Sequence, residues 1–100
     1  MRRFPIDIPE DAIREICGRY YVTELALFGS VLGPEFGPES DIDVLVEFEP
    51  DAPIGFMGYV RLQRELAELL GRQVDLVSKV GLKRRIRKPV LESAQVIYER

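Results

Sequence analysis

The sequence contains no histidine and no tryptophan, and cysteine occurs only once, at Cys17. Without histidine, Ser-His-Asp and Cys-His nucleophile systems and every histidine-containing zinc site are excluded. A single cysteine forms neither an intrachain disulfide nor a cysteine-only zinc site. The first seven residues lack the apolar stretch of a signal peptide, and no apolar run approaches the roughly 20 residues that span a bilayer. We therefore expect a cytoplasmic protein without membrane contact.

The sequence also lacks a large excess of basic or acidic side chains. The 100 residues include 14 Lys and Arg and 17 Asp and Glu, and the resulting net charge of -3 argues against a general nucleic-acid binder. The charges are unevenly placed, because residues 79–100 hold seven basic and two acidic side chains, whereas several carboxylates gather between residues 41 and 51. The length corresponds to one domain, 1–100.

Helix-like and strand-like segments alternate along the chain. Apolar spacing predicts a helix from Pro9 to Gly18 and a second over residues 55–70, with Gly71 as its C-cap and with Phe56 and Met57 in the core. A third helical segment is interrupted or restarted by Pro89. Short apolar runs predict strands over residues 24–28, 41–48, 74–77 and 95–99. This order implies an α/β (α+β) fold in which helices cover a small mixed sheet.

Gly29 and Ser30 stand where the first predicted strand passes into a loop. A Gly-Ser pair there lets the backbone approach a phosphate closely, because glycine has no side chain and the N–H groups and hydroxyl donate hydrogen bonds. Asp41 and Asp43 are two residues apart, so on a strand both carboxylates point to one face. Magnesium is usually held by one or two carboxylates together with substrate phosphates. The two elements therefore predict a site for Mg²⁺ and a nucleoside triphosphate.

Asp75 stands between Val74 and Leu76 in an otherwise apolar strand, where an acidic residue is seldom structural unless it is paired. If its strand lies beside that of Asp41 and Asp43, Asp75 helps to hold a metal and accepts the proton of an attacking hydroxyl group. The alternative is an edge-strand carboxylate paired with Arg72 or Lys79.

Three stretches carry a family resemblance: Leu27-Phe28-Gly29-Ser30, Ser40-Asp41-Ile42-Asp43-Val44-Leu45-Val46 and Gly71-Arg72-Gln73-Val74-Asp75-Leu76-Val77. Over roughly residues 8–100 the chain resembles the minimal nucleotidyltransferase domain of the DNA polymerase beta superfamily. This resemblance implies the nucleotidyltransferase fold and the magnesium-dependent transfer of a nucleotide, usually AMP from ATP, to a hydroxyl group. In the antitoxin branch of the family, the acceptor is a tyrosine of a HEPN-domain toxin.

The resemblance also assigns roles by position. Gly29 and Ser30 bind the nucleotide phosphates, and Asp41, Asp43 and Asp75 are the catalytic, metal-binding carboxylates. The chain is thereby expected to be a protein adenylyltransferase that acts as the antitoxin of a toxin–antitoxin pair, with a nucleoside triphosphate and a HEPN-domain protein as its partners.

The sequence departs from this family directly after Ser30. Members commonly carry arginines in a Gly-Ser-Arg-x-Arg-Gly run, and residues 31–34 of this chain contain none. Lys79, Lys83 or Arg84 are candidates to neutralise the triphosphate instead. A second hypothesis therefore stays open, in which a catalytically weak or inactive chain neutralises the toxin by occlusion.

The basic run over residues 83–88 leaves three interpretations open: a solvated helix face, a docking surface for an acidic partner, or a nucleic-acid contact. The third is the weakest, because aromatic residues are not interleaved with the cations. Ser30 is not expected to be a covalent nucleophile, since no histidine can activate it. An aspartyl nucleophile at Asp41 is disfavoured as well, because the apolar strand follows the motif instead of preceding it.

Overall fold

The computed structural model describes residues 6–100, which form three α-helices, two short 3₁₀ helices and four strands. In chain order the elements are α1 (Glu10–Arg19), β1 (Val22–Phe28), η1 (Gly29–Leu32), β2 (Ile42–Phe48), α2 (Phe56–Leu70), β3 (Val74–Ser78), η2 (Lys79–Gly81), α3 (Arg84–Ser93) and β4 (Gln95–Glu99).

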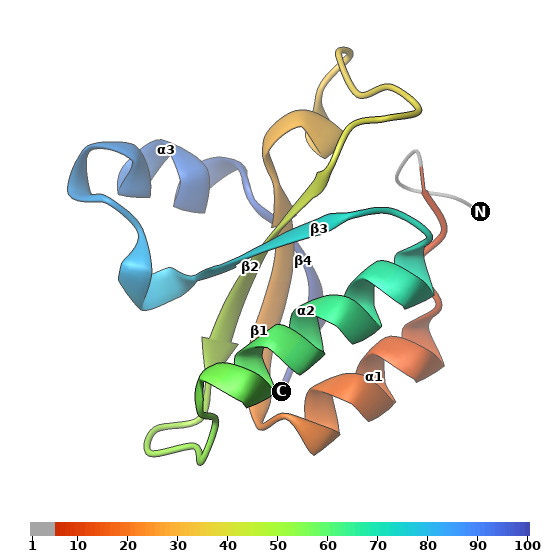
Figure 1. Cartoon of the computed structure of the whole chain (residues 1–100). Coiled ribbons are helices and arrows are strands. Elements are labelled where there is room, and N and C mark those ends of the chain that lie inside the picture. The colour runs from red at the N-terminus through yellow and green to blue at the C-terminus, as the bar shows by residue number, and fades with distance from the viewer. Residues whose placement is uncertain (1–5) are drawn as a thin grey trace.

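The four strands form one mixed sheet with the order β3-β2-β1-β4 (Figure 1). β1 runs antiparallel to both β2 and β4, whereas β2 and β3 are parallel. A parallel pair needs a long crossover connection, and α2 supplies it. The architecture confirms the α+β class predicted from the sequence.

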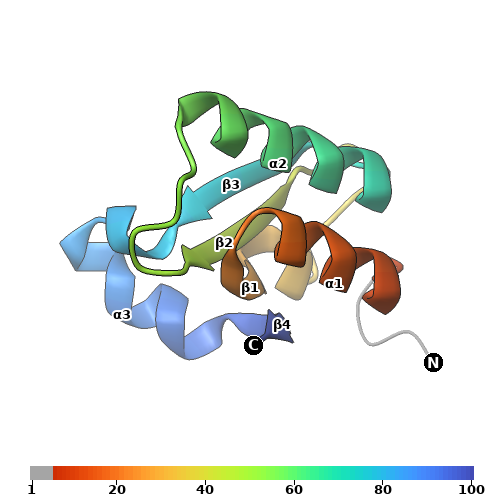
Figure 2. The same ribbon diagram turned by 90° about the horizontal axis from the view of Figure 1, so that it is seen from below.

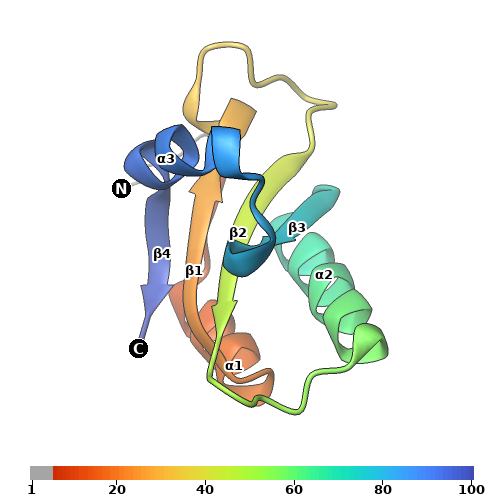
Figure 3. The ribbon, with the colours of Figure 1, turned by 90° about the vertical axis from the view of Figure 1, so that its left-hand side faces the viewer.

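Helices cover both faces of the sheet. α1 and α2 lie side by side on one face, and α3 lies on the other (Figure 2, Figure 3). The larger core lies beneath α1 and α2 and includes Leu27 and Val44, whereas α3 covers a smaller core built around Ala26 and Leu45. Neighbouring residues of one strand thus belong to opposite cores, as the alternation of side chains requires. α2 is the longest of these helices with 15 residues, and within residues 6–100 none combines the length and the hydropathy of a membrane span.

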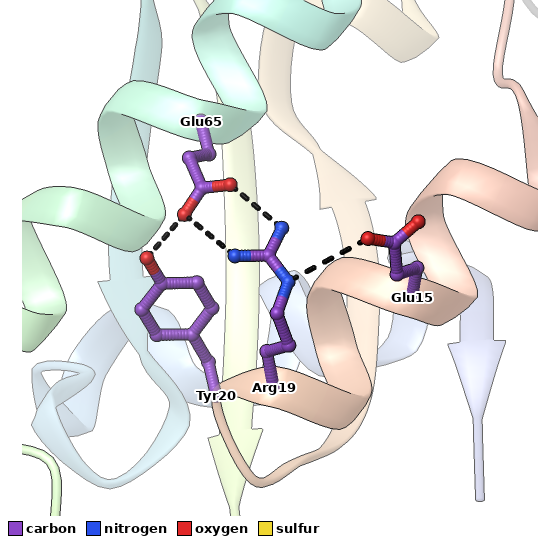
Figure 4. Close-up of polar contacts among 4 residues, drawn as sticks. All are labelled: Glu15, Arg19, Tyr20 and Glu65. Carbon is purple, nitrogen blue, oxygen red and sulfur yellow. Dashed lines mark hydrogen bonds and ion pairs between the residues drawn. The ribbon is translucent and has the colours of Figure 1, made fainter.

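A polar cluster joins the C-terminal end of α1 to the middle of α2 (Figure 4). Arg19 donates two hydrogen bonds to the carboxylate of Glu65, at 2.8 and 3.3 Å, and the hydroxyl of Tyr20 donates to the same carboxylate. Glu15 Oε1 lies 3.8 Å from Nε of the same Arg19 side chain. The bonds from Arg19 and Tyr20 hold the pKa of Glu65 below its ordinary value. The cluster fixes the two helices against each other on the face that α3 does not cover.

Two predictions about the helices are wrong. Phe56 and Met57 are 80% and 62% exposed, because the buried stripe of α2 begins only at Leu62 and continues through Leu66. Pro89 lies inside a continuous α3 and does not interrupt it. Pro89 cannot donate to the carbonyl oxygen of Arg85, four residues earlier. Both side chains are exposed, so water can solvate that carbonyl.

Candidate active site

The parallel pairing of β2 with β3 sets Asp43 level with Asp75 on the neighbouring strand. The residues on either side of each aspartate pack into the core beneath α1 and α2, so both carboxylates face the opposite side of the sheet. Asp41, one residue before β2, is exposed at the same end of the sheet. The structure thus places the strand of Asp75 beside that of Asp41 and Asp43.

Gly29 follows β1 directly and lies against Asp43. Phe28, the last residue of β1, is level with Asp43, and the chain then turns with a φ of +77° at Gly29. A Cβ atom on Gly29 would overlap a carboxylate oxygen of Asp43. A residue with a Cβ atom would therefore strain the left-handed backbone here and displace the Asp43 carboxylate. The exposed Ser30 comes next, so the proposed phosphate-binding pair adjoins the carboxylates.

The environment of Asp43 disfavours its charge. Burial raises the pKa of this carboxyl, and the negative charges of Asp75 and Asp41 raise the pKa further. Each of these causes acts against the ionised form, and a bound cation would oppose all of them. The surroundings of Asp43 thus favour the binding of a cation next to its carboxylate.

The donor atoms fit magnesium. Within residues 6–100, no three carboxylate or thiol side chains converge closely enough to form a preformed metal cage. Magnesium rarely uses such a cage, because it keeps several waters and binds one or two carboxylates together with substrate phosphates. Asp43, with Asp41 or Asp75 beside it, supplies oxygen ligands of this kind, and the N–H groups near Gly29 and the hydroxyl of Ser30 are donors of the kind that bind a phosphate.

Side chains of α2 support the strand that carries Asp75. The Tyr59 hydroxyl donates to the carbonyl oxygen of Leu76 at 2.6 Å, and Gln63 Oε1 accepts from the N–H of Leu76 at 3.0 Å. β3 is an edge strand, so these bonds satisfy backbone groups that no further strand pairs with. Burial, followed by the charge of Asp75, raises the pKa of Tyr59. Neither support was predictable from the sequence, because the apolar periodicity of α2 does not reveal which of its polar side chains reach β3.

The alternative partners of Asp75 are engaged elsewhere. Lys79 Nζ lies 3.0 Å from Glu24 Oε2, and Arg72 Nη1 donates to the carbonyl oxygens of Gly37 and Ser40. Of the three cations considered as replacements for the family arginines, Lys79 is thus bound to a carboxylate, and Lys83 and Arg84 are exposed at the start of α3.

Comparisons with known proteins agree with this geometry. Residues 10–97 match the family described as the nucleotidyltransferase domain. The protein adenylyltransferase MntA of Thermococcus cleftensis is 40% identical over 85 residues, which cover 85% of this chain and 82% of that protein.

Solved structures share the fold. A chain described as a minimal nucleotidyltransferase superposes with a TM-score of 0.70 at 38% identity, over 85% of both chains. A complex of the tri-AMPylated HEPN toxin of Shewanella oneidensis with an MNT antitoxin matches with a TM-score of 0.63, over 91% of this chain and 70% of that chain. Its sequence identity is 20%, so this last likeness concerns the fold alone.

Proposed function

The chain belongs to the nucleotidyltransferase domain family and is a nucleotidyltransferase, and we propose that it transfers AMP from ATP to a hydroxyl group with the help of magnesium. The proposal rests above all on the level placement of Asp43 and Asp75, with Gly29 packed against Asp43. The identity to a protein adenylyltransferase supports AMP as the transferred group and a protein as the acceptor.

Each residue has a defined part in this reaction. The backbone near Gly29 and the hydroxyl of Ser30 hold the phosphates. One or two of the carboxylates of Asp41, Asp43 and Asp75 would hold magnesium together with the phosphates, and the ion would supply positive charge against the triphosphate. Asp75 accepts the proton of the acceptor hydroxyl while that oxygen forms a bond to the α-phosphorus. The bond between the α-phosphorus and the bridging oxygen breaks, and pyrophosphate leaves.

A tyrosine of a HEPN-domain toxin is the acceptor that we propose. A structural relative of this chain is an MNT antitoxin in complex with a tri-AMPylated HEPN toxin, and the shared fold supports the same pairing here. In this role the chain is an antitoxin that disables the toxin by covalent modification.

Labelling of the partner tests the proposal. ATP that is radioactive at the α-phosphate is incubated with magnesium, the chain and a purified HEPN-domain protein, and label is expected on the HEPN-domain protein. Asp43→Asn should reduce labelling by about 100-fold or more, because a metal-binding carboxylate contributes several kcal/mol to the transition state. Asp51→Asn is the matched control, since Asp51 is exposed in the turn after β2 and has a φ of 60° that asparagine tolerates. Equal labelling by Asp43→Asn and the control would refute the proposal.

Occlusion without catalysis is the second candidate. It is favoured by the lack of arginine in residues 31–34 and by a shallow groove of about 420 Å³ on α3, which Arg84, Arg87 and Lys88 help to line. An acidic toxin surface would complement these cations. If Asp43→Asn still protects cells from the toxin while Arg84→Glu combined with Arg87→Glu and Lys88→Glu does not, occlusion is correct. The reverse pattern supports catalysis.

A further inference from the structure

The loop over residues 33–40 joins the proposed phosphate-binding pair to Asp41, and it extends beyond the end of the sheet (Figure 1). It contains two glycines and two prolines, and it follows η1 without forming a strand or helix of its own. Two short bonds tie its end together: Ser40 N–H donates to Gly37 O at 3.1 Å, and Gly37 N–H donates to Ser40 Oγ at 2.9 Å. The position of Asp41 therefore depends on what holds this loop to the rest of the molecule.

Arg72 holds the loop with three contacts. Its Nη1 atom donates to the carbonyl oxygens of Gly37 at 3.0 Å and Ser40 at 2.7 Å, and its guanidinium carbon lies 4.5 Å from the centroid of the Phe36 ring. A planar guanidinium can form hydrogen bonds in its plane and stack on a ring with its face, whereas a lysine ammonium cannot do both. The combination is therefore specific to arginine.

These contacts hold the backbone on both sides of Asp41. The carbonyl of Ser40 belongs to the peptide bond that precedes Asp41, and Arg72 binds it. The N–H of Ile42, which follows Asp41, donates to the carbonyl oxygen of Gln73 at 2.9 Å. Two successive residues of the α2–β3 turn thus hold Asp41 in place, and the same segment continues into β3 and Asp75.

We propose that Arg72 is a positioning residue that sets Asp41 relative to Asp43 and Asp75, so that carboxylates of this group can bind a divalent cation together with the nucleotide phosphates. This inference rests on the proposed function. Arg72 acts through the backbone of the loop and does not touch the nucleotide. Residues that orient metal ligands in this way matter for affinity, because a ligand that is free to rotate must be ordered when the metal binds.

The test compares Arg72→Met and Arg72→Lys with Arg64→Met, a control on the exposed side of α2. Binding of Mn²⁺ together with α,β-methylene ATP is measured by electron paramagnetic resonance, and hydrogen exchange is followed at the amides of Gly37, Ser40 and Ile42. Arg72→Met should weaken Mn²⁺ binding by about 10- to 100-fold and speed exchange at these amides. Arg72→Lys should fold like the wild type yet show most of the same loss, because one ammonium cannot replace the three contacts. The control should match the wild type.

Three outcomes would overturn the inference. A lower Tm in Arg72→Met with unchanged Mn²⁺ affinity means that Arg72 only stabilises the fold. Weaker binding of the analogue without faster amide exchange means that Arg72 contacts the nucleotide itself. Full recovery by Arg72→Lys means that charge alone matters. None of these measurements involves an acceptor, so a wild-type chain that binds Mn²⁺ and the analogue but transfers no AMP would refute the proposed function and leave the role of Arg72 standing.

Discussion

The substitution Gly29→Ala tests the closest approach in the candidate site. Gly29 has a φ of +77°, and a Cβ atom there would overlap the carboxylate of Asp43. Gly71 is the matched control, since its φ is +70° and a Cβ atom there would meet nothing within 4 Å. Both positions demand the same backbone conformation, and only Gly29 adds a contact with a proposed metal ligand.

The structure sets the size of the two effects. A left-handed backbone costs a residue with a Cβ atom about 1–2 kcal/mol, so Gly71→Ala should lose roughly this amount of unfolding free energy. Gly29→Ala adds the displacement of the Asp43 side chain from its rotamer, about 0.5–1.5 kcal/mol, and should lose about 1.5–3.5 kcal/mol in total. Each kcal/mol corresponds to about 4–8 °C in Tm for a domain of this size.

Activity separates the two variants more sharply than stability. A displacement of about 1 Å at a reacting centre can lower the rate about 100-fold, so Gly29→Ala should lose most AMP transfer while Gly71→Ala keeps it. The assay measures transfer of labelled AMP well below the Tm of both variants, with Tm read from circular dichroism. If the two alanine variants lose equal stability and retain equal activity, the packing of Gly29 against Asp43 has no functional meaning.

Three further results are expected. Burial and the charges of Asp75 and Asp41 raise the pKa of Asp43, so ionisation of Asp43 disfavours the folded chain. The free energy of unfolding therefore falls as pH rises from the ordinary pKa of 3.8 through the raised pKa. In urea unfolding, Asp43→Asn should be more stable than the wild type at neutral pH and equally stable at about pH 3. Hydrogen bonds from Arg19 and Tyr20 lower the pKa of Glu65. The stabilisation that these bonds give the folded chain is fully present above the ordinary pKa of 4.5 and is lost as pH falls through the lowered pKa. Glu65→Gln should therefore reduce the loss of Tm at acid pH in a profile of Tm against pH. Burial raises the pKa of Cys17 to about 12, so a thiol reagent should react with it in denaturant and hardly at all in native buffer, and fast native labelling would contradict its burial.

The local order of the elements was predictable because it depends on short-range patterns. The strand at residues 95–99 has the bounds that its apolar run predicted, and Gly71 caps α2 in the left-handed conformation. Cys17 is buried on the apolar stripe of α1. The burial predicted for Phe56 and Met57 was wrong. Periodicity indicates which face of a helix is buried, but it does not indicate at which turn the helix begins to cover the sheet.

The candidate residues were recognisable one by one, and their arrangement was not. Spacing alone predicted that Asp41 and Asp43 share a face, since residues two apart on a strand do so. The pairing of Asp43 with Asp75 depends on strand order and register, and the bonds from Arg72 to Gly37 and Ser40 link residues 35 and 32 positions apart. No local pattern encodes such contacts.

By itself, the sequence determined which chemistry this protein lacks and which it favours: the lack of histidine excludes a Ser-His-Asp or Cys-His nucleophile system, and carboxylates near a Gly-Ser turn predict a phosphate and a hard cation as ligands. The tertiary structure alone decided that Gly29 packs against Asp43, that Asp75 stands level with it, and that Arg72 holds the backbone before Asp41. The physical reason is that residue type fixes which interactions a side chain can make, whereas chain topology fixes which side chains come within reach of one another.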